Sequence, residues 1–194
     1  MPQSEAGTGV ETSSSEGGEP GDGGEVIFDG GSNIDLDAGE GLDAGPDGSA
    51  CNMLANDAPP ITSACVSAAP VLGGGALVAG TYFLTKVSVL ATPNFCSMKF
   101  VPTGFKETLS LIVNAQGVGT ADTHTSIGGG GTRRRTTTLT PSGANQSPLQ
   151  AASTCPAQPS VAVPYLSLVV AGKQELVMRL PYGTGEGLYR FEKQ

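Results

Sequence analysis

The sequence contains no tryptophan and only one histidine, and its first 50 residues contain no lysine or arginine. The same 50 residues carry twelve of the 18 acidic residues, 13 of the 29 glycines and a single aromatic residue, Phe28. Such a segment cannot bury enough apolar surface to offset the roughly 1–2 kcal/mol per residue that ordering a backbone costs. We therefore predict that residues 1–50 form a disordered acidic linker.

This division also separates the charges of the chain. The formal net charge of -8 divides into -12 for residues 1–50 and +4 for the remaining residues, which hold all ten lysines and arginines. The part of the chain that can fold is therefore slightly basic, although the whole chain is acidic.

Long apolar runs are absent as well. No stretch approaches the roughly 18 apolar residues of a membrane-spanning helix, and Met1–Gly7 has neither the basic nor the apolar region of an export signal. Either the protein is cytosolic with reduced thiols, or the sequence begins downstream of an export signal. We favour the second interpretation, because a long acidic leader before a disulfide-capable domain is typical of a surface tether. It predicts a location in the cell envelope (periplasm or outer-membrane surface), with membrane contact only through a lipid anchor lost from this sequence.

Cysteines with the Cys-x-x-Cys spacing of metal sites are also missing. The four cysteines, Cys51, Cys65, Cys96 and Cys155, all follow the acidic segment. An even number in a small chain rich in β-type residues predicts two disulfides in an oxidising compartment. We prefer a bridge from Cys51 or Cys65 to Cys155, while all three pairings stay open. A zinc site is the competing interpretation, and only His124 could complete it.

A short repeat in the acidic segment, Leu36–Gly39 and Leu42–Gly45, suggests calcium binding, because aspartates in glycine-rich turns supply oxygen ligands. The repeat lacks the residue order of an EF-hand. We therefore predict an acidic linker and no metal or other cofactor.

No segment shows helical periodicity, whereas residues 78–90 have the β-branched and aromatic content of a long strand. Period-two alternation places Phe83, Val87 and Val89 on one face of this strand, and Tyr82 and Leu84 on the other. Residues 51–76, which precede it, are rich in Ala, Ser, Pro and Gly. We predict an irregular, cysteine-containing entry segment there.

Residues 105–113 alternate in the same way, with Glu107 on the face of Leu109 and Leu111. Consecutive short strands with turn signals between them predict an all-β fold. We expect an antiparallel up-and-down β-barrel of about eight strands over residues 77–194, because closure removes exposed sheet edges. A β-sandwich is the alternative. The other predicted strands are 96–101, 118–126, 132–140, 146–154, 165–170, 175–180 and 188–193.

Three short segments suggest a family. Gly80–Thr85 after a glycine-rich entry, Thr154–Pro156 after a threonine-rich strand and the terminal Tyr189–Gln194 together resemble the lipocalin-like domains of small bacterial cell-envelope lipoproteins. The resemblance extends loosely over residues 35–194. It implies a β-barrel behind an Asp-Ala-Gly-rich spacer that follows a lipidated cysteine.

The resemblance also implies one contact. Lipocalins close the base of the barrel with a Gly-x-Trp segment on the first strand, and an arginine near the end of the barrel packs over that tryptophan. Tyr82 would take the place of the tryptophan here, and Arg190 that of the arginine. The absence of tryptophan and of a Thr-Asp-Tyr segment departs from the family pattern, so lipocalin ligand chemistry is not carried over.

Catalytic motifs are scarce. Asp122, His124 and Ser126 alternate along one strand face, but no Gly-x-Ser-x-Gly elbow accompanies them, and nothing in the sequence indicates an oxyanion site. We predict that the protein is not an enzyme and that His124 is a surface residue. The run Gly128–Gly131 lacks a Walker lysine and a following helix, so we interpret it as a hairpin turn.

The triplet Arg133, Arg134 and Arg135 is the most prominent basic feature. On a strand, Arg133 and Arg135 point to one side and Arg134 to the other, so at least one arginine faces the barrel interior or its mouth. Three roles stay open: an inward hook for the carboxylate or phosphate of an amphiphile, an outward contact with an anionic envelope surface, and an edge charge that deters strand addition. No aromatic stacking platform accompanies the triplet, which argues against nucleic-acid binding.

These observations predict a non-enzymatic cell-envelope protein whose lipocalin-like barrel binds a small apolar or amphiphilic ligand. The candidate contact residues are Tyr82, Arg133, Arg135 and Arg190. The alternative is a structural or surface interaction module without a small-molecule ligand. In that case large side chains fill the barrel completely. The residues expected to fill it are Phe83, Leu109, Leu111, Leu168, Met178 and Phe191.

Overall fold

The computed structural model describes residues 50–61, 63–90, 104–127, 131–182 and 185–194. These residues form ten β-strands and no helix, so none of them belongs to a helix that could cross a membrane. The predicted linker, apart from Ala50, and the strand predicted at 96–101 lie outside the described residues. The all-β prediction is confirmed.

Most strands that are consecutive in sequence are also neighbours in the sheet. The order of hydrogen-bonded strands is β7-β6-β5-β4-β3-β2-β10-β9-β8, every pair in it is antiparallel, and β1 pairs with β2 in parallel. The strands are β1 (Ser63–Val66), β2 (Gly80–Leu90), β3 (Lys106–Val113), β4 (Gly119–Ser126), β5 (Thr132–Pro141), β6 (Leu149–Cys155), β7 (Val161–Val163), β8 (Tyr165–Val170), β9 (Lys173–Tyr182) and β10 (Gly185–Lys193).

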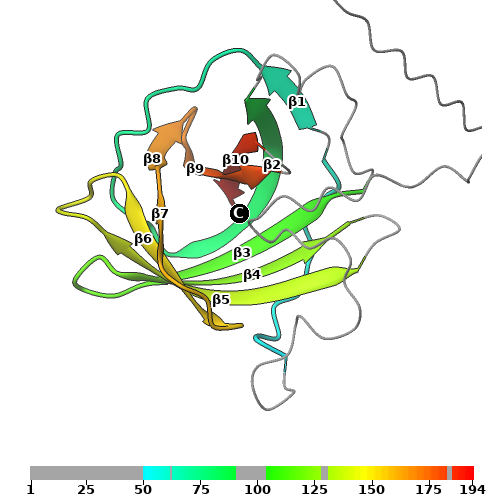
Figure 1. Ribbon diagram of the computed structural model, residues 1–194, viewed down its shortest axis with the longest axis horizontal. Coiled ribbons are helices and arrows are strands. Elements are labelled where there is room, and N and C mark those ends of the chain that lie inside the picture. The colour runs from blue at the N-terminus through cyan, green and yellow to red at the C-terminus, as the bar shows by residue number, and fades with distance from the viewer. Residues whose placement is uncertain (1–49, 62, 91–103, 128–130, 183–184) are drawn as a thin grey trace, which may run out of the picture.

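This order describes a barrel that is nearly closed (Figure 1). The first long strand, β2, pairs with the last, β10. The two ends of the order, β7 and β8, are separated in sequence only by Pro164. The chain therefore changes its pairing partner at Pro164, from β6 to β9. The Pro164 carbonyl still accepts a hydrogen bond, from the Arg179 amide at 2.9 Å. The predicted antiparallel up-and-down barrel is confirmed.

A β-bulge in β2 corrects one prediction. The register between β2 and β10 shifts at Thr85, and an extra residue reverses which face the following side chains occupy. Tyr82 and Leu84 before the bulge and Val87 and Val89 after it are all buried. The prediction that these two pairs face opposite sides is wrong, because period-two alternation does not continue through a bulge.

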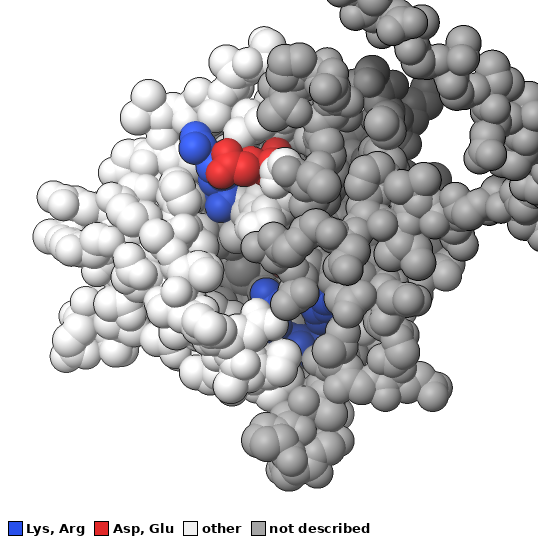
Figure 2. All heavy atoms as spheres, viewed as in Figure 1, with Lys and Arg blue, Asp and Glu red and all other residues white. Residues whose placement is uncertain are grey.

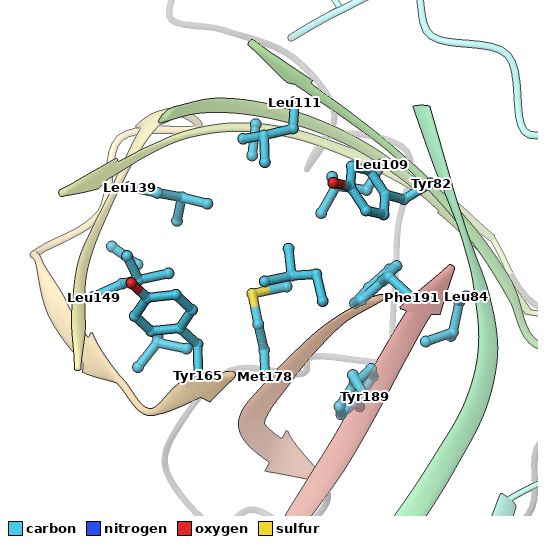
Figure 3. Close-up of a cluster of buried hydrophobic side chains, with 14 of the residues drawn as sticks. Tyr82, Leu84, Leu109, Leu111, Leu139, Leu149, Tyr165, Met178, Tyr189 and Phe191 are labelled. Atoms are coloured by element: carbon cyan, nitrogen blue, oxygen red, sulfur yellow. The ribbon is translucent and has the colours of Figure 1, made fainter. Parts of the chain in front are cut away.

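The hydrophobic core lies inside the barrel (Figure 3). Leu84, Leu149, Tyr165 and Phe191 have no exposed surface at all. Burying a side chain of this size stabilises the fold by about 1.5–3 kcal/mol. Figure 3 shows such side chains from β2, β3, β5, β6, β8, β9 and β10 pointing toward the centre of the ring of strands.

Most of the side chains expected to fill the barrel do so. Leu109, Leu111, Met178 and Phe191 belong to the buried core cluster. Phe83 and Leu168 are only half-buried.

The base of the barrel, the end at which β2 begins, is covered by the residues just before β2. The Tyr82 hydroxyl donates to the Val78 carbonyl at 2.6 Å, and the Tyr165 hydroxyl donates to the Gly75 carbonyl at 2.8 Å. Leu77 packs into the core cluster. This end is therefore closed by protein, and we call the opposite end, where β3 and β5 begin, the mouth.

The predicted entry segment is not wholly irregular, because β1 belongs to it. β3 pairs with β2 only over Gly80–Phe83, while β1 pairs with Val87–Leu90. Ahead of β1, the Ile61 amide donates to the Phe105 carbonyl at 2.9 Å. The entry segment thus fills the space that opens between β2 and β3 near the mouth.

The start of the entry segment forms a strap, residues 51–58, across the outer face of β3, β4 and β5. Asn52 Nδ2 donates to the Arg135 carbonyl at 3.0 Å, and Asn56 Nδ2 donates to Ser126 Oγ at 2.9 Å. A disulfide joins Cys51 to Cys155 at the end of β6. The predicted bridge to Cys155 is therefore confirmed for Cys51.

Cys65 is also disulfide-bonded. Cys96 lies outside the described residues, so its pairing stays a prediction.

Candidate ligand-binding site

Two arginines of the triplet face the barrel interior near its mouth. The pairing of β3 with β4 and of β4 with β5 runs without a register shift. Alternation along β5 therefore places Arg133 and Arg135 on the face of the buried Leu139. Arg134 points outward, where its Nη1 donates to the Asn52 carbonyl at 3.0 Å. The predicted alternation is confirmed. Residues 132–135 pair with β4 only, because the pairing of β5 with β6 begins at Thr136, so the interpretation as edge charges stays a prediction.

Glu107 lies in the same interior region. It stands opposite Thr125 of β4, which in turn stands opposite Arg133, and its neighbours on the same face of β3 are core leucines. Burial raises the pKa of Glu107 to about 7, although a hydrogen bond with the Thr125 side chain and the charge of Arg135 act in the opposite direction. A carboxyl group in this position changes its charge near neutral pH.

Arg135 is a half-buried cation of this region. Its Nε is buried and has no hydrogen-bond partner among the described residues. Burial and the nearby positive charge of Arg133 lower the pKa of Arg135, and Glu107 partly compensates for this. A desolvated guanidinium with an unsatisfied donor is costly unless an acceptor is supplied.

Aromatic side chains form another part of this interior region. Tyr189 of β10 is buried, and its ring centroid lies 6.4 Å from that of Phe105 and 6.5 Å from that of Tyr182. Burial, with smaller contributions from Glu107 and Tyr182, raises the pKa of the Tyr189 hydroxyl. The ring contact with Phe105, two residues before Glu107, places Tyr189 close to the start of β3.

We call these residues the mouth cluster, and they combine two features. Its cations, carboxyl and hydroxyls lie toward the mouth, and the apolar core lies beneath them. Such a combination can hold a polar head group while an apolar chain contacts aromatic and aliphatic side chains. The members of the mouth cluster are Glu107, Thr125, Arg133, Arg135, Tyr182 and Tyr189.

Figure 2 shows the surface charges in the view of Figure 1. The charged side chains form an upper and a lower group in this view. In the upper group, acidic and basic side chains lie side by side. The other group is basic, and it borders a hollow.

His124 is not a surface residue, contrary to the prediction. Its side chain is only 8% exposed and lies beneath the strap, with Nδ1 at 2.8 Å from the Leu54 carbonyl and 3.3 Å from Arg134 Nη2. Asp122 accepts from Thr136 Oγ1 at 2.6 Å. The polar groups of this outer face are thus engaged in holding the strap.

Tyr82 and Arg190 do not come together. Tyr82 points into the core, while Arg190 is exposed on the outer face of β10 and forms an ion pair of 3.1 Å with Glu175. The predicted stacking of Arg190 over Tyr82 is therefore absent. Of the four candidate contact residues, the structure gathers only Arg133 and Arg135 at one site.

Sequence reasoning missed Glu107, Thr125, Tyr182 and Tyr189 as site residues. One signal for Glu107 was available, because an acid shares a strand face with Leu109 and Leu111. The tyrosines carried no comparable signal, since their position near the start of β3 depends on the pairing of β10 with β2. Among the described residues, no group of three or more His, Cys, Asp or Glu side chains could hold a metal ion.

The fold and the mouth cluster define the protein as an antiparallel β-barrel with a closed base, an apolar interior and a charged group inside its mouth. Comparisons with known protein families, curated proteins and solved structures find no match.

Proposed function

We propose that the barrel binds a small amphiphilic molecule at its mouth, without catalysing a reaction. The observation that carries this proposal is Arg135 on the interior face of β5, whose buried Nε has no acceptor among the residues that the structure describes. Holding charges in a desolvated site costs several kcal/mol per ion when they are incompletely paired. A ligand with an anionic head group supplies the missing acceptor, and the aromatic wall at Tyr189 receives its apolar part.

The second candidate function is a structural or surface interaction module without a ligand. The closed base and the fully buried side chains of Leu84, Leu149 and Phe191 support it, because they fill the lower part of the barrel. This candidate gives no role to charges on an interior face. For that reason we place it second.

We also propose that the protein acts in the cell envelope. The Cys51–Cys155 disulfide supports this location, because such bonds persist in oxidising compartments. The acidic residues 1–50 would then separate the barrel from an anchoring surface. Non-reducing mass analysis of the protein from its own source tests this part, and four free thiols would contradict it.

Ligand binding is tested by native mass spectrometry of the full chain with its disulfides intact. We expect an additional mass that is lost on denaturation, or, for protein purified empty, binding of dodecanoate as a probe. Arg135→Met should weaken dodecanoate binding at least tenfold, because a charged partner contributes roughly 1.5–3 kcal/mol to such a contact. Lys86→Met, at an exposed position of β2, is the control and should bind normally.

Two results would contradict the proposed binding site. If the protein carries no guest and binds no dodecanoate, the ligand proposal fails and the packed module is supported. Equal binding by Arg135→Met and Lys86→Met would show that the probe binds elsewhere.

A further inference from the structure

We propose that the mouth cluster takes the carboxylate of an amphiphile together with one proton, and that Glu107 holds this proton. The inference rests on the proposed function. It adds the chemistry of the head group and a residue that determines when binding occurs.

The first step concerns the head group. Arg135 Nε is buried and has no acceptor within the described part of the chain. Arg133 lies on the same face two residues away, and its positive charge acts on Arg135. A carboxylate matches the planar donor geometry of a guanidinium and neutralises charge at the same time. An alcohol of the same chain length offers only a neutral acceptor.

The second step concerns the carboxyl already in the site. Glu107 stands opposite Thr125, which stands opposite Arg133, and Arg135 is the next residue on that face of β5, so a carboxylate bound at Arg135 comes close to Glu107. Two carboxylates that share one site cannot both stay ionised at low cost, and the pKa of one of them rises. A protonated Glu107 removes this repulsion and can donate a hydrogen bond to the bound carboxylate.

The third step concerns which group can take up the proton. Arginine and tyrosine side chains ordinarily titrate far above neutral pH, and Thr125 does not titrate. That leaves Glu107 as the group of the cluster that changes charge near pH 7. Among the described residues, the polar groups around Glu107 are Thr125 from β4, Arg133 and Arg135 from β5 and Tyr189 from β10.

The consequence is a dependence of affinity on pH. Above pH 7 the empty site holds an ionised Glu107, whose pKa is about 7, and binding then requires a proton from solution. Between pH 6.5 and 8.5 the affinity should fall about twentyfold by proton linkage. A carboxylate probe stays ionised over this range, because carboxyl groups in water titrate near pH 4.

The test is calorimetric titration of the full, oxidised chain with sodium dodecanoate at pH 7.5, in two buffers of different ionisation enthalpy. The difference between the two heats gives the protons taken up, and we expect about 0.5–1 per ligand. Glu107→Gln should take up none and should bind with the same affinity, within about twofold, at pH 6.5 and 8.5. Glu186→Gln, an exposed acid in β10, should behave as the unchanged protein does. Dodecanol should bind more weakly and without proton uptake.

Two outcomes separate this inference from the proposed function. If dodecanoate binds without proton uptake, or if Glu107→Gln keeps the pH dependence, the inference is overturned and the proposed function stands. If dodecanoate does not bind at any pH and native mass spectrometry finds no guest, both are overturned. The buffer comparison on the unchanged protein gives this answer even if a variant does not fold.

Discussion

At the scale of single residues, Glu107 and Arg135 are exceptions to the pattern around them. Both occupy strand faces that also carry core side chains, Leu109 on β3 and Leu139 on β5. Apolar replacements at such positions commonly stabilise proteins, because buried charges lose their hydration. Their presence inside the mouth therefore indicates a use other than stability, which binding provides.

Replacement of Glu107 by glutamine tests this cost directly. Because the pKa of Glu107 in the folded protein is raised from 4.5 to about 7, the stability that Glu107 contributes is complete below pH 4.5 and is lost as the pH rises through 7. Glu107→Gln should match the unchanged protein at pH 4.5 and exceed its free energy of unfolding by about 1–3 kcal/mol at pH 8.5. Urea unfolding at both pH values measures this difference.

The same measurement on Glu186→Gln provides the control, because that side chain is 58% exposed. A stability difference for Glu107→Gln that does not change between the two pH values would contradict the raised pKa.

At the scale of elements, the entry segment completes the barrel. Near the mouth, β1 pairs with β2 where β3 no longer does. On the other side of the barrel, Gly74 forms bridges with both Gln146 and Leu166. It thereby joins the β5–β6 connection to β8, close to the point at which β7 gives way to β8. The strands of residues 77–194 therefore depend on residues before them for two of their junctions.

Gly74→Ala should destabilise the barrel at this junction. Gly74 has a φ of 96°, and an added Cβ would come within 2.3 Å of the Asn145 carbonyl oxygen and 2.7 Å of the Ser147 nitrogen. Because these neighbours are backbone atoms, the junction must open or shift. We expect a loss of about 2–4 kcal/mol in the free energy of unfolding, within the range of strained and overpacked substitutions.

Gly73→Ala is the matched control for that substitution. No atom of the described residues lies within 4 Å of its added Cβ, so its effect should stay within about 0.5 kcal/mol. Equal stability of the two variants would show that the junction does not depend on Gly74.

At the scale of the whole molecule, one covalent link joins the start of the folded part to a distant strand. The Cys51–Cys155 bond spans 104 residues of sequence and fixes the strap across β3, β4 and β5. Beneath the strap, His124 is buried and Asn56 contacts both β3 and β4. The bond thus secures polar contacts that a free strap would exchange with water.

The double substitution of Cys51 and Cys155 by alanine should lower the free energy of unfolding by about 2–5 kcal/mol, because a long loop is no longer closed in the unfolded chain. Thermal or urea unfolding measures this loss. Hydrogen exchange at the Ala58 amide, which donates to Thr108 Oγ1 at 3.3 Å, should become faster at the same time. An unchanged stability together with slow exchange would show that the hydrogen bonds of the strap suffice to hold it.

Local patterns in the sequence determined much of the architecture. Alternation in residues 105–113 and turn signals between neighbours predicted most strands and the antiparallel barrel, because both depend on contacts between residues close in sequence. The same alternation set Arg133 and Arg135 apart from Arg134. These predictions needed no knowledge of which strands are distant partners.

Only the tertiary structure decided the features that depend on contacts between segments far apart in sequence. The bulge at Thr85 placed Tyr82 in the core, the strap covered His124, and closure through β10 brought Tyr189 near Glu107. Each of these results arises from contacts between segments far apart in sequence, whose register local periodicity does not specify. The sequence by itself therefore determined the strands and the direction of the arginines. Barrel closure decided which side chains meet inside the mouth.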